Sequence, residues 1–214
     1  MNIPHSSMEP ILRRTRVMPI ITIRDSSIAA DIARALVAGG LSAMEVTLRT
    51  PAAFDAIAAV AREVPQCTIG AGTVLDAAQF ERAAQAGAKF AVSPGTTDGL
   101  LAAAARLKIA FLPAVSTPTE MMRGYEAGYD IFKFFPAEEL GGPTVLRKLY
   151  GPLPHIRFCA SGSLNAAQAA GYAGLPNVLG VGGAWMAPAE LVEKRDWAAI
   201  TALAKAAAAI WPAA

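Results

Sequence analysis

Lys133 lies in the middle of a short apolar run at residues 129–136 (YDIFKFFP). The run is rich in aromatic residues and has turn or breaker residues on both sides, a pattern that predicts a buried strand. Because side chains on a strand alternate between faces, Lys133 shares its face with Ile131 and Phe135. An ammonium group desolvated there must pair with a carboxylate or lose its proton. The run alone fits a structural ion pair, a lysine whose stem carries its charge out to solvent, or a reactive amine.

A second set of polar residues alternates along residues 43–48 (AMEVTL) and just beyond. Glu45, Thr47 and Arg49 share one face of this predicted strand, and the larger apolar residues share the other. The apolar face should pack against helices, which turns Glu45 and Arg49 toward the interior. A structural pair between Glu45 and Lys133 remains possible. However, a charge pair in a core adds little net stability over apolar filling, which weakens a purely structural account of the pair.

The elements that must position these residues alternate between strands and helices along the whole chain. The pattern predicts strands at residues 18–23, 43–48, 67–70, 89–92, 109–112, 129–136, 155–159 and 177–181. Helices are expected at residues 8–16 and 27–38, from Pro51, up to 86, from 117 to 127, after 141–143, and at 164–173 and 197–210. Thr73 with Asp76, and Thr117 with Glu120, have the spacing of capping boxes.

Eight strand–helix units predict an α/β fold, a (β/α)8 TIM barrel whose strands are parallel. The alternative is an open doubly wound sheet, which should carry a Gly-x-Gly-x-x-Gly sequence after its first strand. Residues 23–27 (IRDSS) contain no glycine, so the barrel is favoured. We expect one domain over residues 1–214, with the helix at 8–16 capping the barrel.

The composition excludes several classes of function. Among 214 residues, 54% are hydrophobic, 17% are charged and the formal net charge is +2. A balance so close to neutral, without a basic run, gives no electrostatic case for nucleic acid or an anionic membrane. No apolar run approaches the roughly 18 residues that span a bilayer, and we expect no secretory signal. Cys67 and Cys159 both fall in predicted strands, which is typical of free thiols in a reducing cytoplasm.

The sequence offers little for metal chemistry. Its two histidines are His5, near the N-terminus, and His155, at the start of a predicted strand and away from the site. No ligand cluster and no Ser-His-Asp arrangement can be assembled from these residues. An amine, a carboxylate and a guanidinium remain, a set that suits Schiff-base chemistry on a carbonyl compound bearing an anion. Burial can lower a lysine pKa from about 10.4 by up to about 3–5 units, and an ionised Glu45 opposes that shift.

Several motifs resemble those of the class I 2-keto-3-deoxy-6-phosphogluconate (KDPG) and 4-hydroxy-2-oxoglutarate aldolases. The matching segments occur in order between residues 18 and 188: EVTLRT at 45–50, GAGTV at 70–74, SPG at 93–95, FKFFPA at 132–137, RFC at 157–159 and GG at 182–183. The resemblance implies that Lys133 forms the Schiff base and that Glu45 shuttles protons. It also implies that Arg49 and Thr73 hold the substrate carboxylate.

The resemblance further implies a pocket and a phosphate site. Pro94 and Phe135 match residues that line the pocket. The phosphate would bind at two loops, which contain Ser161, Gly162, Ser163, Gly182, Gly183 and Ala184. These loops depart from the family's Thr-Gly-Gly and Gly-Gly-Ser: serine replaces a glycine at Ser163, which is unfavourable where φ is positive. Ala184 lacks a hydroxyl, which should cost phosphate binding about 1–2 kcal/mol.

The implied reaction is cleavage of 2-dehydro-3-deoxy-6-phosphogluconate to pyruvate and glyceraldehyde 3-phosphate, a step of the Entner–Doudoroff pathway. The family implies a cytoplasmic homotrimer that needs no metal or other cofactor beyond the covalent Schiff base on Lys133. One alternative is the same chemistry on 4-hydroxy-2-oxoglutarate, which gives pyruvate and glyoxylate. The others are a sugar-phosphate isomerase, with no lysine nucleophile, and a non-catalytic phosphate-binding barrel.

Overall fold

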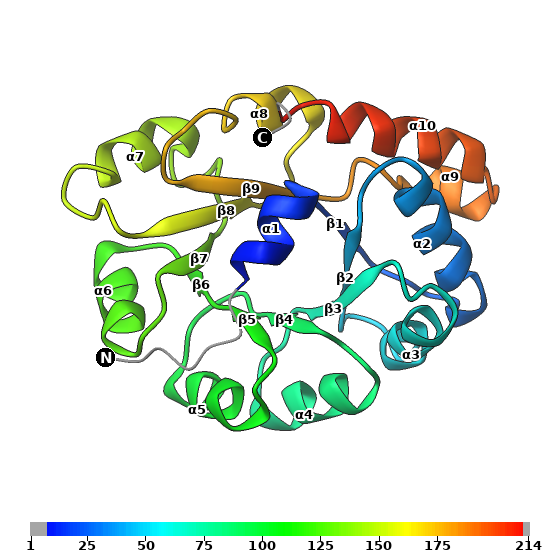
Figure 1. Ribbon diagram of the computed structural model, residues 1–214, viewed down its shortest axis with the longest axis horizontal. Helices are drawn as coiled ribbons and strands as arrows, with labels where there is room; N and C mark the ends of the chain where they lie inside the picture. Colours follow the sequence, from blue (N-terminus) through cyan, green and yellow to red (C-terminus); the bar gives the residue numbers. More distant parts are fainter. Residues whose placement is uncertain (1–7, 212–214) are drawn as a thin grey trace.

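The strands form a closed ring around a packed interior in the computed structural model, which describes residues 8–211 (Figure 1). All ladders are parallel, and the sheet order is β5-β4-β3-β2-β1-β9-β8-β7-β6. The strands are β1 (Val17–Ile21), β2 (Ala43–Thr47), β3 (Thr68–Gly72), β4 (Phe90–Val92), β5 (Ala110–Leu112), β6 (Ala114–Val115), β7 (Ile131–Phe134), β8 (Arg157–Ser161) and β9 (Val178–Gly183).

Strands β5 and β6 are two halves of one strand path, separated by Pro113. Proline has no backbone N–H to give to a ladder, so the regular pairing is interrupted there. The β5 half pairs with β4, and the β6 half pairs with β7, which joins the two ends of the sheet. The barrel of eight strand–helix units predicted from the sequence is therefore confirmed.

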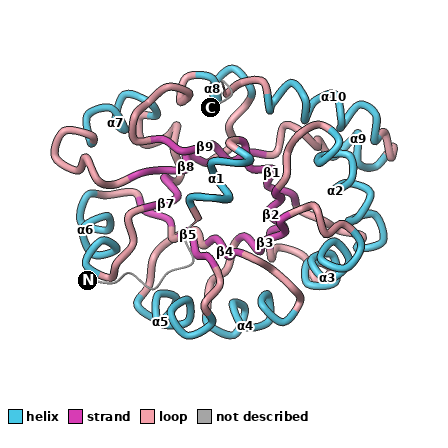
Figure 2. Tube along the Cα trace, viewed as in Figure 1, coloured by secondary structure: helices cyan, strands magenta, loops and turns pink. Residues whose placement is uncertain are grey.

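Helices surround the strand ring on its outside (Figure 2). They are α1 (Glu9–Thr15), η1 (Ser26–Ile28), α2 (Ala29–Ala38), α3 (Ala53–Glu63), α4 (Ala77–Gln85), α5 (Asp98–Leu107), α6 (Pro118–Glu126), α7 (Gly142–Leu149), α8 (Ala166–Ala170), α9 (Ala189–Glu193) and α10 (Trp197–Ala208). The ring of helices closes where α10 packs against α2, with the Thr201 hydroxyl donating to the Ala35 carbonyl at 3.0 Å.

Helix α1 is the exception, because it crosses the middle of the ring (Figure 1). Its Leu12 belongs to the same buried cluster as residues from the beginnings of the strands, such as Ala43 and Ile131. Arg16, just after the helix, donates from its guanidinium to the Leu179 carbonyl at 3.0 Å. The predicted capping helix is thus confirmed, and it closes the amino-terminal end of the barrel. The carboxyl ends of the strands are left for a site.

The structure corrects several expected boundaries. The helix expected from Pro51 begins at Ala53, and the helix expected at 164–173 covers only α8, with Asn165 as its cap. Cys67 precedes β3 instead of lying in a strand. The strand expected at 155–159 is β8, which begins at Arg157, because the Ile156 N–H still donates to the Leu153 carbonyl in a turn at 3.1 Å. The exposed His155 ring packs on Tyr125, with ring centroids 4.3 Å apart.

One of the two predicted capping boxes is present and the other is not. The Thr117–Glu120 capping box is present, with the Thr117 hydroxyl accepting from the Glu120 N–H. The Thr73–Asp76 box is wrong: Asp76 is the N-cap of α4 and accepts from the Gln79 N–H at 2.7 Å. Thr73 has a left-handed backbone with φ 58°, so it cannot serve as a cap with extended backbone.

Candidate active site

Lys133 and Glu45 meet inside the barrel, although their strands are not neighbours in the sheet. Lys133 Nζ lies 3.9 Å from Glu45 Oε1, and the two residues are 7% and 2% exposed. Met44 and Phe132, next to them in sequence, belong to the cluster between sheet and helices, so the alternation turns both charged residues inward. The expected inward convergence of an amine and a carboxylate is confirmed.

The buried carboxylate of Glu45 is only partly satisfied. Its Oε1 atom has no hydrogen-bond partner among residues 8–211. Burial raises the pKa of Glu45 above its usual range, and the charges of Lys133 and Arg49 oppose that rise without cancelling it. A carboxyl group whose pKa is raised in this way holds a proton more readily than an exposed one, as a group that both accepts and returns a proton must.

Gly72, the last residue of β3, makes room for Glu45. A Cβ atom on Gly72 would lie 1.9 Å from Glu45 Oε1 and 2.6 Å from its carboxyl carbon. Any side chain there would displace the carboxylate. This role of Gly72 cannot be predicted from the local sequence, because it depends on how closely two strands approach and on the direction of one side chain.

The surroundings of the Lys133 amine are aromatic and apolar. Its Nζ lies 5.0 Å from the centroid of the half-buried Phe135 ring, within the range of a cation–π contact. In the next strand, Cys159 is in register with Lys133 and is buried. Burial raises the pKa of Cys159 to about 12, so its thiol stays protonated and leaves the amine as the available nucleophile.

Arg49 and Thr73 come together after β2 and β3. The Arg49 Nε donates to the Thr73 hydroxyl at 3.3 Å, and Arg49 is exposed at the open end of the barrel. The left-handed backbone of Thr73 turns its hydroxyl toward the arginine instead of toward the helix that follows. A guanidinium beside a hydroxyl is a set of donors suited to a carboxylate.

The two loops expected to bind phosphate lie side by side, since Ser161 is in register with Gly182. Gly162 and Ser163 both have positive φ, 128° and 50°, so Ser163 occupies a conformation that disfavours a side chain. The expectation about this serine is confirmed at the level of the backbone. Gly183 is also closely packed, because a Cβ atom there would lie 2.1 Å from the Trp185 ring.

The remaining expected residues lie further out. Pro94 is exposed in the loop after β4, and Ala184 is exposed in the loop after β9. A hydroxyl pair lies at the same end of the barrel: Thr22 and Thr47 are joined by a hydrogen bond of 2.8 Å. The alternation along the strand placed Thr47 on the inward face with Glu45, but its pairing with Thr22 was not expected.

No group of three or more His, Cys, Asp or Glu side chains among residues 8–211 is arranged to hold a metal ion. In the same range, each helix is too short or too polar to cross a membrane.

The sequence matches the family model of KDPG and KHG aldolases over residues 8–203. It is 46% identical over 203 residues to the 2-dehydro-3-deoxy-phosphogluconate aldolase of Pseudoalteromonas atlantica, which covers 95% of this chain and 94% of the relative. It is 45% identical to the KHG/KDPG aldolase of Escherichia coli K12, over 94% of this chain and 95% of that one.

Solved structures agree. The KDPG aldolase of Legionella pneumophila, with pyruvate captured as a covalent carbinolamine, superposes with a TM-score of 0.91 at 40% identity and covers 94% of this chain and 98% of its own. The corresponding enzyme of Zymomonas mobilis ZM4, with 3-phosphoglycerate, gives a TM-score of 0.90 at 45% identity, with 95% of each chain covered.

Proposed function

This chain belongs to the KDPG and KHG aldolase family, and we propose that it cleaves 2-dehydro-3-deoxy-6-phosphogluconate to pyruvate and glyceraldehyde 3-phosphate. The observation that carries the proposal is the buried Lys133 amine 3.9 Å from a partly satisfied Glu45 carboxylate. The named activities of the relatives and the covalent pyruvate adduct of the Legionella enzyme support it. This cleavage is a step of the Entner–Doudoroff pathway.

Lys133 begins the reaction as the nucleophile. Its amine attacks the C2 ketone to give a carbinolamine, and loss of water leaves a protonated imine that can accept an electron pair. Glu45 removes the proton of the C4 hydroxyl, and the C3–C4 bond breaks. The electron pair of that bond passes to the imine and forms an enamine, while C4 leaves as the aldehyde carbon of glyceraldehyde 3-phosphate.

Glu45 then completes the cycle. Protonation of the enamine on C3 regenerates the imine, and attack by water releases pyruvate and the free Lys133 amine. A single carboxyl group serves both proton transfers, because the raised pKa of Glu45 allows it to hold and return a proton. The reaction needs no metal and no cofactor beyond this covalent intermediate.

The two ends of the substrate are held by different strands. Arg49 and Thr73 orient the carboxylate, supported by their mutual hydrogen bond at the open end of the barrel. Phe135 and Pro94 line the pocket between the two ends. The phosphate binds at the paired loops of Ser161, Gly162 and Ser163 and of Gly182, Gly183 and Ala184, whose backbone groups lie next to one another.

Trapping with borohydride tests the lysine. The protein is incubated with pyruvate, reduced, digested and mapped by mass spectrometry. We expect the adduct on Lys133 and none on the exposed Lys148, which serves as an internal control. An adduct absent from Lys133 would refute the Schiff-base mechanism and leave the isomerase or the non-catalytic barrel as the better interpretation.

A second substrate is favoured by one observation. Ala184 provides no hydroxyl at the phosphate end, and 4-hydroxy-2-oxoglutarate carries no phosphate. The same chemistry on that substrate would give pyruvate and glyoxylate. Comparing kcat/KM for the two substrates decides between them, and we expect the phosphorylated one to be preferred.

We also infer that the whole chain acts as one catalytic domain in a cytoplasmic homotrimer. Its two buried and unpaired cysteines suit a reducing compartment. Large apolar side chains are exposed on its surface, among them Leu75 and Met122 at 57% and 55%, and these suit contacts between subunits. Light scattering coupled to size-exclusion chromatography tests the trimer.

A further inference from the structure

Two threonine hydroxyls at the open end of the barrel take no part in the proton transfers of the proposed reaction. Thr22, just after β1, and Thr47, the last residue of β2, are joined by a hydrogen bond of 2.8 Å. Thr47 is buried, at 1% exposure, whereas Thr22 is exposed. Each hydroxyl carries one proton and two lone pairs, so a single shared bond leaves the pair able to bind another polar group. That group would meet the pair at Thr22.

The place of Thr22 follows from Ile20, which precedes it by two residues and packs on the interior cluster of the barrel. Ile20 is in register with Glu45 of the next strand. It also approaches the loops proposed to hold phosphate, since a Cβ atom on Gly182 would lie 2.8 Å from Ile20 Cδ1 and 3.3 Å from Ser161 Oγ. Ile20 therefore lies between the general base and the phosphate loops, and Thr22 is the next inward residue toward the open end.

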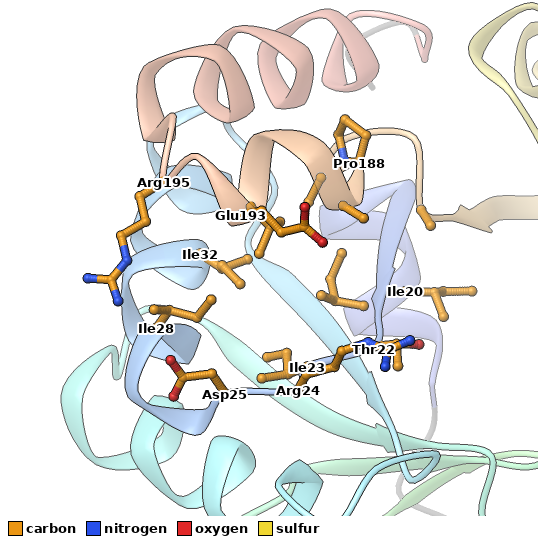
Figure 3. A pocket seen from close by; sticks show the side chains of 15 residues that line it. Ile20, Thr22, Ile23, Arg24, Asp25, Ile28, Ile32, Pro188, Glu193 and Arg195 are labelled. Atoms are coloured by element: carbon orange, nitrogen blue, oxygen red, sulfur yellow. The ribbon is translucent and has the colours of Figure 1, made fainter.

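A cavity of about 450 Å³ opens beside Thr22. Ile20, Thr22 and Ala184 are among the residues that line it, so it reaches from the end of β1 to the loop after β9. Figure 3 shows Ile20 and Thr22 on the same side of this cavity. A molecule that enters the open end of the barrel can therefore reach the Thr22 hydroxyl.

We propose that the Thr22 hydroxyl binds the C5 hydroxyl of the substrate, in an inference that rests on the proposed function. Glu45 acts at C4, and C6 carries the phosphate, so C5 lies between these two sites, as Thr22 does. The C5 hydroxyl is both a donor and an acceptor, so it can bond Thr22 whichever threonine of the pair supplies the shared proton.

Thr47 acts through Thr22 and is a positioning residue. The bond from its buried hydroxyl holds the exposed Thr22 side chain in one orientation. The pair thus selects for an acceptor aldehyde that carries a hydroxyl on the carbon next to the aldehyde.

The synthetic direction of the reaction tests this contact, because the C5 hydroxyl comes from the acceptor aldehyde. Wild type and Thr22→Val are assayed with pyruvate and either glyceraldehyde 3-phosphate or 3-phosphooxypropanal, the analogue that lacks the hydroxyl. We expect the ratio of kcat/KM for the first aldehyde to that for the second to fall by about 2- to 10-fold in Thr22→Val, as for one lost hydrogen bond. Comparing this ratio between proteins removes the intrinsic difference in reactivity of the two aldehydes.

Three further variants separate recognition of the hydroxyl from support of the fold. Thr22→Ser keeps the hydroxyl and should stay within about twofold of the wild-type ratio. Thr47→Val should lower the ratio by a smaller factor than Thr22→Val, because Thr22 keeps its hydroxyl but loses the bond that holds it. Thr201→Val is the matched control: it removes a hydroxyl that donates to the Ala35 carbonyl at 3.0 Å outside the strand ring, and it should leave the ratio unchanged.

Borohydride trapping of pyruvate separates this inference from the function on which it rests. Trapping requires Lys133 but no acceptor aldehyde, so each variant should trap pyruvate as the wild type does. If the wild type makes no product from pyruvate and glyceraldehyde 3-phosphate, the proposed function is wrong. If it makes the product and Thr22→Val keeps the wild-type ratio, the contact with C5 is refuted and the pair only joins the ends of β1 and β2. Should Thr22→Val fail to trap pyruvate, the ratio measured with Thr22→Ala decides.

Discussion

The Lys133 amine and the Glu45 carboxylate lie 3.9 Å apart across the inside of the barrel, on β7 and β2. Three strands separate β2 from β7 in the sheet, so the pair depends on closure of the ring. The separation is longer than a hydrogen bond, and Glu45 Oε1 is unsatisfied among the described residues. A buried pair in this state contributes little to stability, which points to selection for chemistry.

Removing both charges tests this interpretation. We expect the double variant Lys133→Met/Glu45→Gln to lose all cleavage and all pyruvate trapping. Its free energy of unfolding should equal that of the wild type or exceed it by up to about 4 kcal/mol, because two desolvated charges are gone. Chemical denaturation measures the difference. A loss of more than about 2 kcal/mol would show that the pair stabilises the fold.

The stability of the protein should depend on pH through Glu45. Its pKa is raised above the usual value of 4.5 because burial disfavours the charged form. The folded state therefore binds more protons than the unfolded state above pH 4.5, and the contribution of Glu45 to stability falls as pH rises from there toward the folded-state pKa. Replacing the carboxyl group removes this dependence.

Thermal unfolding of Glu45→Gln and of the wild type, each measured from about pH 4 to about pH 8, tests this pH dependence of stability. The Tm difference, variant minus wild type, should grow more positive as pH rises. The exposed Glu190→Gln serves as the control and should show a difference that does not vary with pH. A Glu45→Gln difference that is constant, or that falls with pH, would contradict the raised pKa.

Gly72→Ala should damage both the site and the fold. The new Cβ would lie 1.9 Å from Glu45 Oε1, so the carboxylate must move away from Lys133. We expect a loss of about 1–3 kcal/mol in stability from overpacking. The rate of cleavage should fall by about 100-fold or more, as for a misplaced general base. Stopped assays measure the rate of cleavage, and denaturant unfolding measures the free energy of unfolding.

The same substitution at Gly99 is the matched control. Gly99 is in helix α5, and a Cβ atom there would have no neighbour within 4 Å. Gly99→Ala should leave cleavage unchanged and stabilise the helix by about 0.5–1 kcal/mol. If the two variants behave alike, the close contact with Glu45 is not the cause of the damage at Gly72.

Ala184→Ser should strengthen binding at the phosphate end. The exposed Ala184 follows β9 beside the proposed phosphate loop, and serine adds a donor there. One additional hydrogen bond is worth about 0.5–1.5 kcal/mol, so KM for the phosphorylated substrate should fall about 2- to 10-fold. KM for 4-hydroxy-2-oxoglutarate should not change. An equal fall for both substrates would show that residue 184 does not lie near the phosphate.

The local pattern of the sequence predicted which residues face the interior. Alternation along a strand has a period of two and depends on the backbone alone, so it turned Glu45 and Lys133 inward without knowledge of their neighbours. The same holds for Thr117 and Glu120, whose capping box is formed within one turn of chain. Repetition of the strand–helix unit then predicted the barrel.

Where the local pattern predicted a cap or a strand boundary wrongly, contacts between distant segments decided the structure. Thr73 has the spacing of a cap, but its hydroxyl accepts from Arg49, and Asp76 caps the helix instead. The start of β8 depends on the neighbouring strand as well: Arg157 is the first of its residues whose N–H donates to that strand, at the Asp130 carbonyl, whereas the Ile156 N–H donates within a turn to Leu153. In both cases a partner from another element decides where the local pattern ends.

The sequence by itself determined the fold, the chemical types of the site residues and the sides of the strands on which they lie. Only the tertiary structure decided the 3.9 Å between Lys133 and Glu45 and the room that Gly72 provides. The reason is physical: strand periodicity and capping arise within a few residues, whereas distance, burial and the resulting pKa of Glu45 arise from the closure of the whole ring.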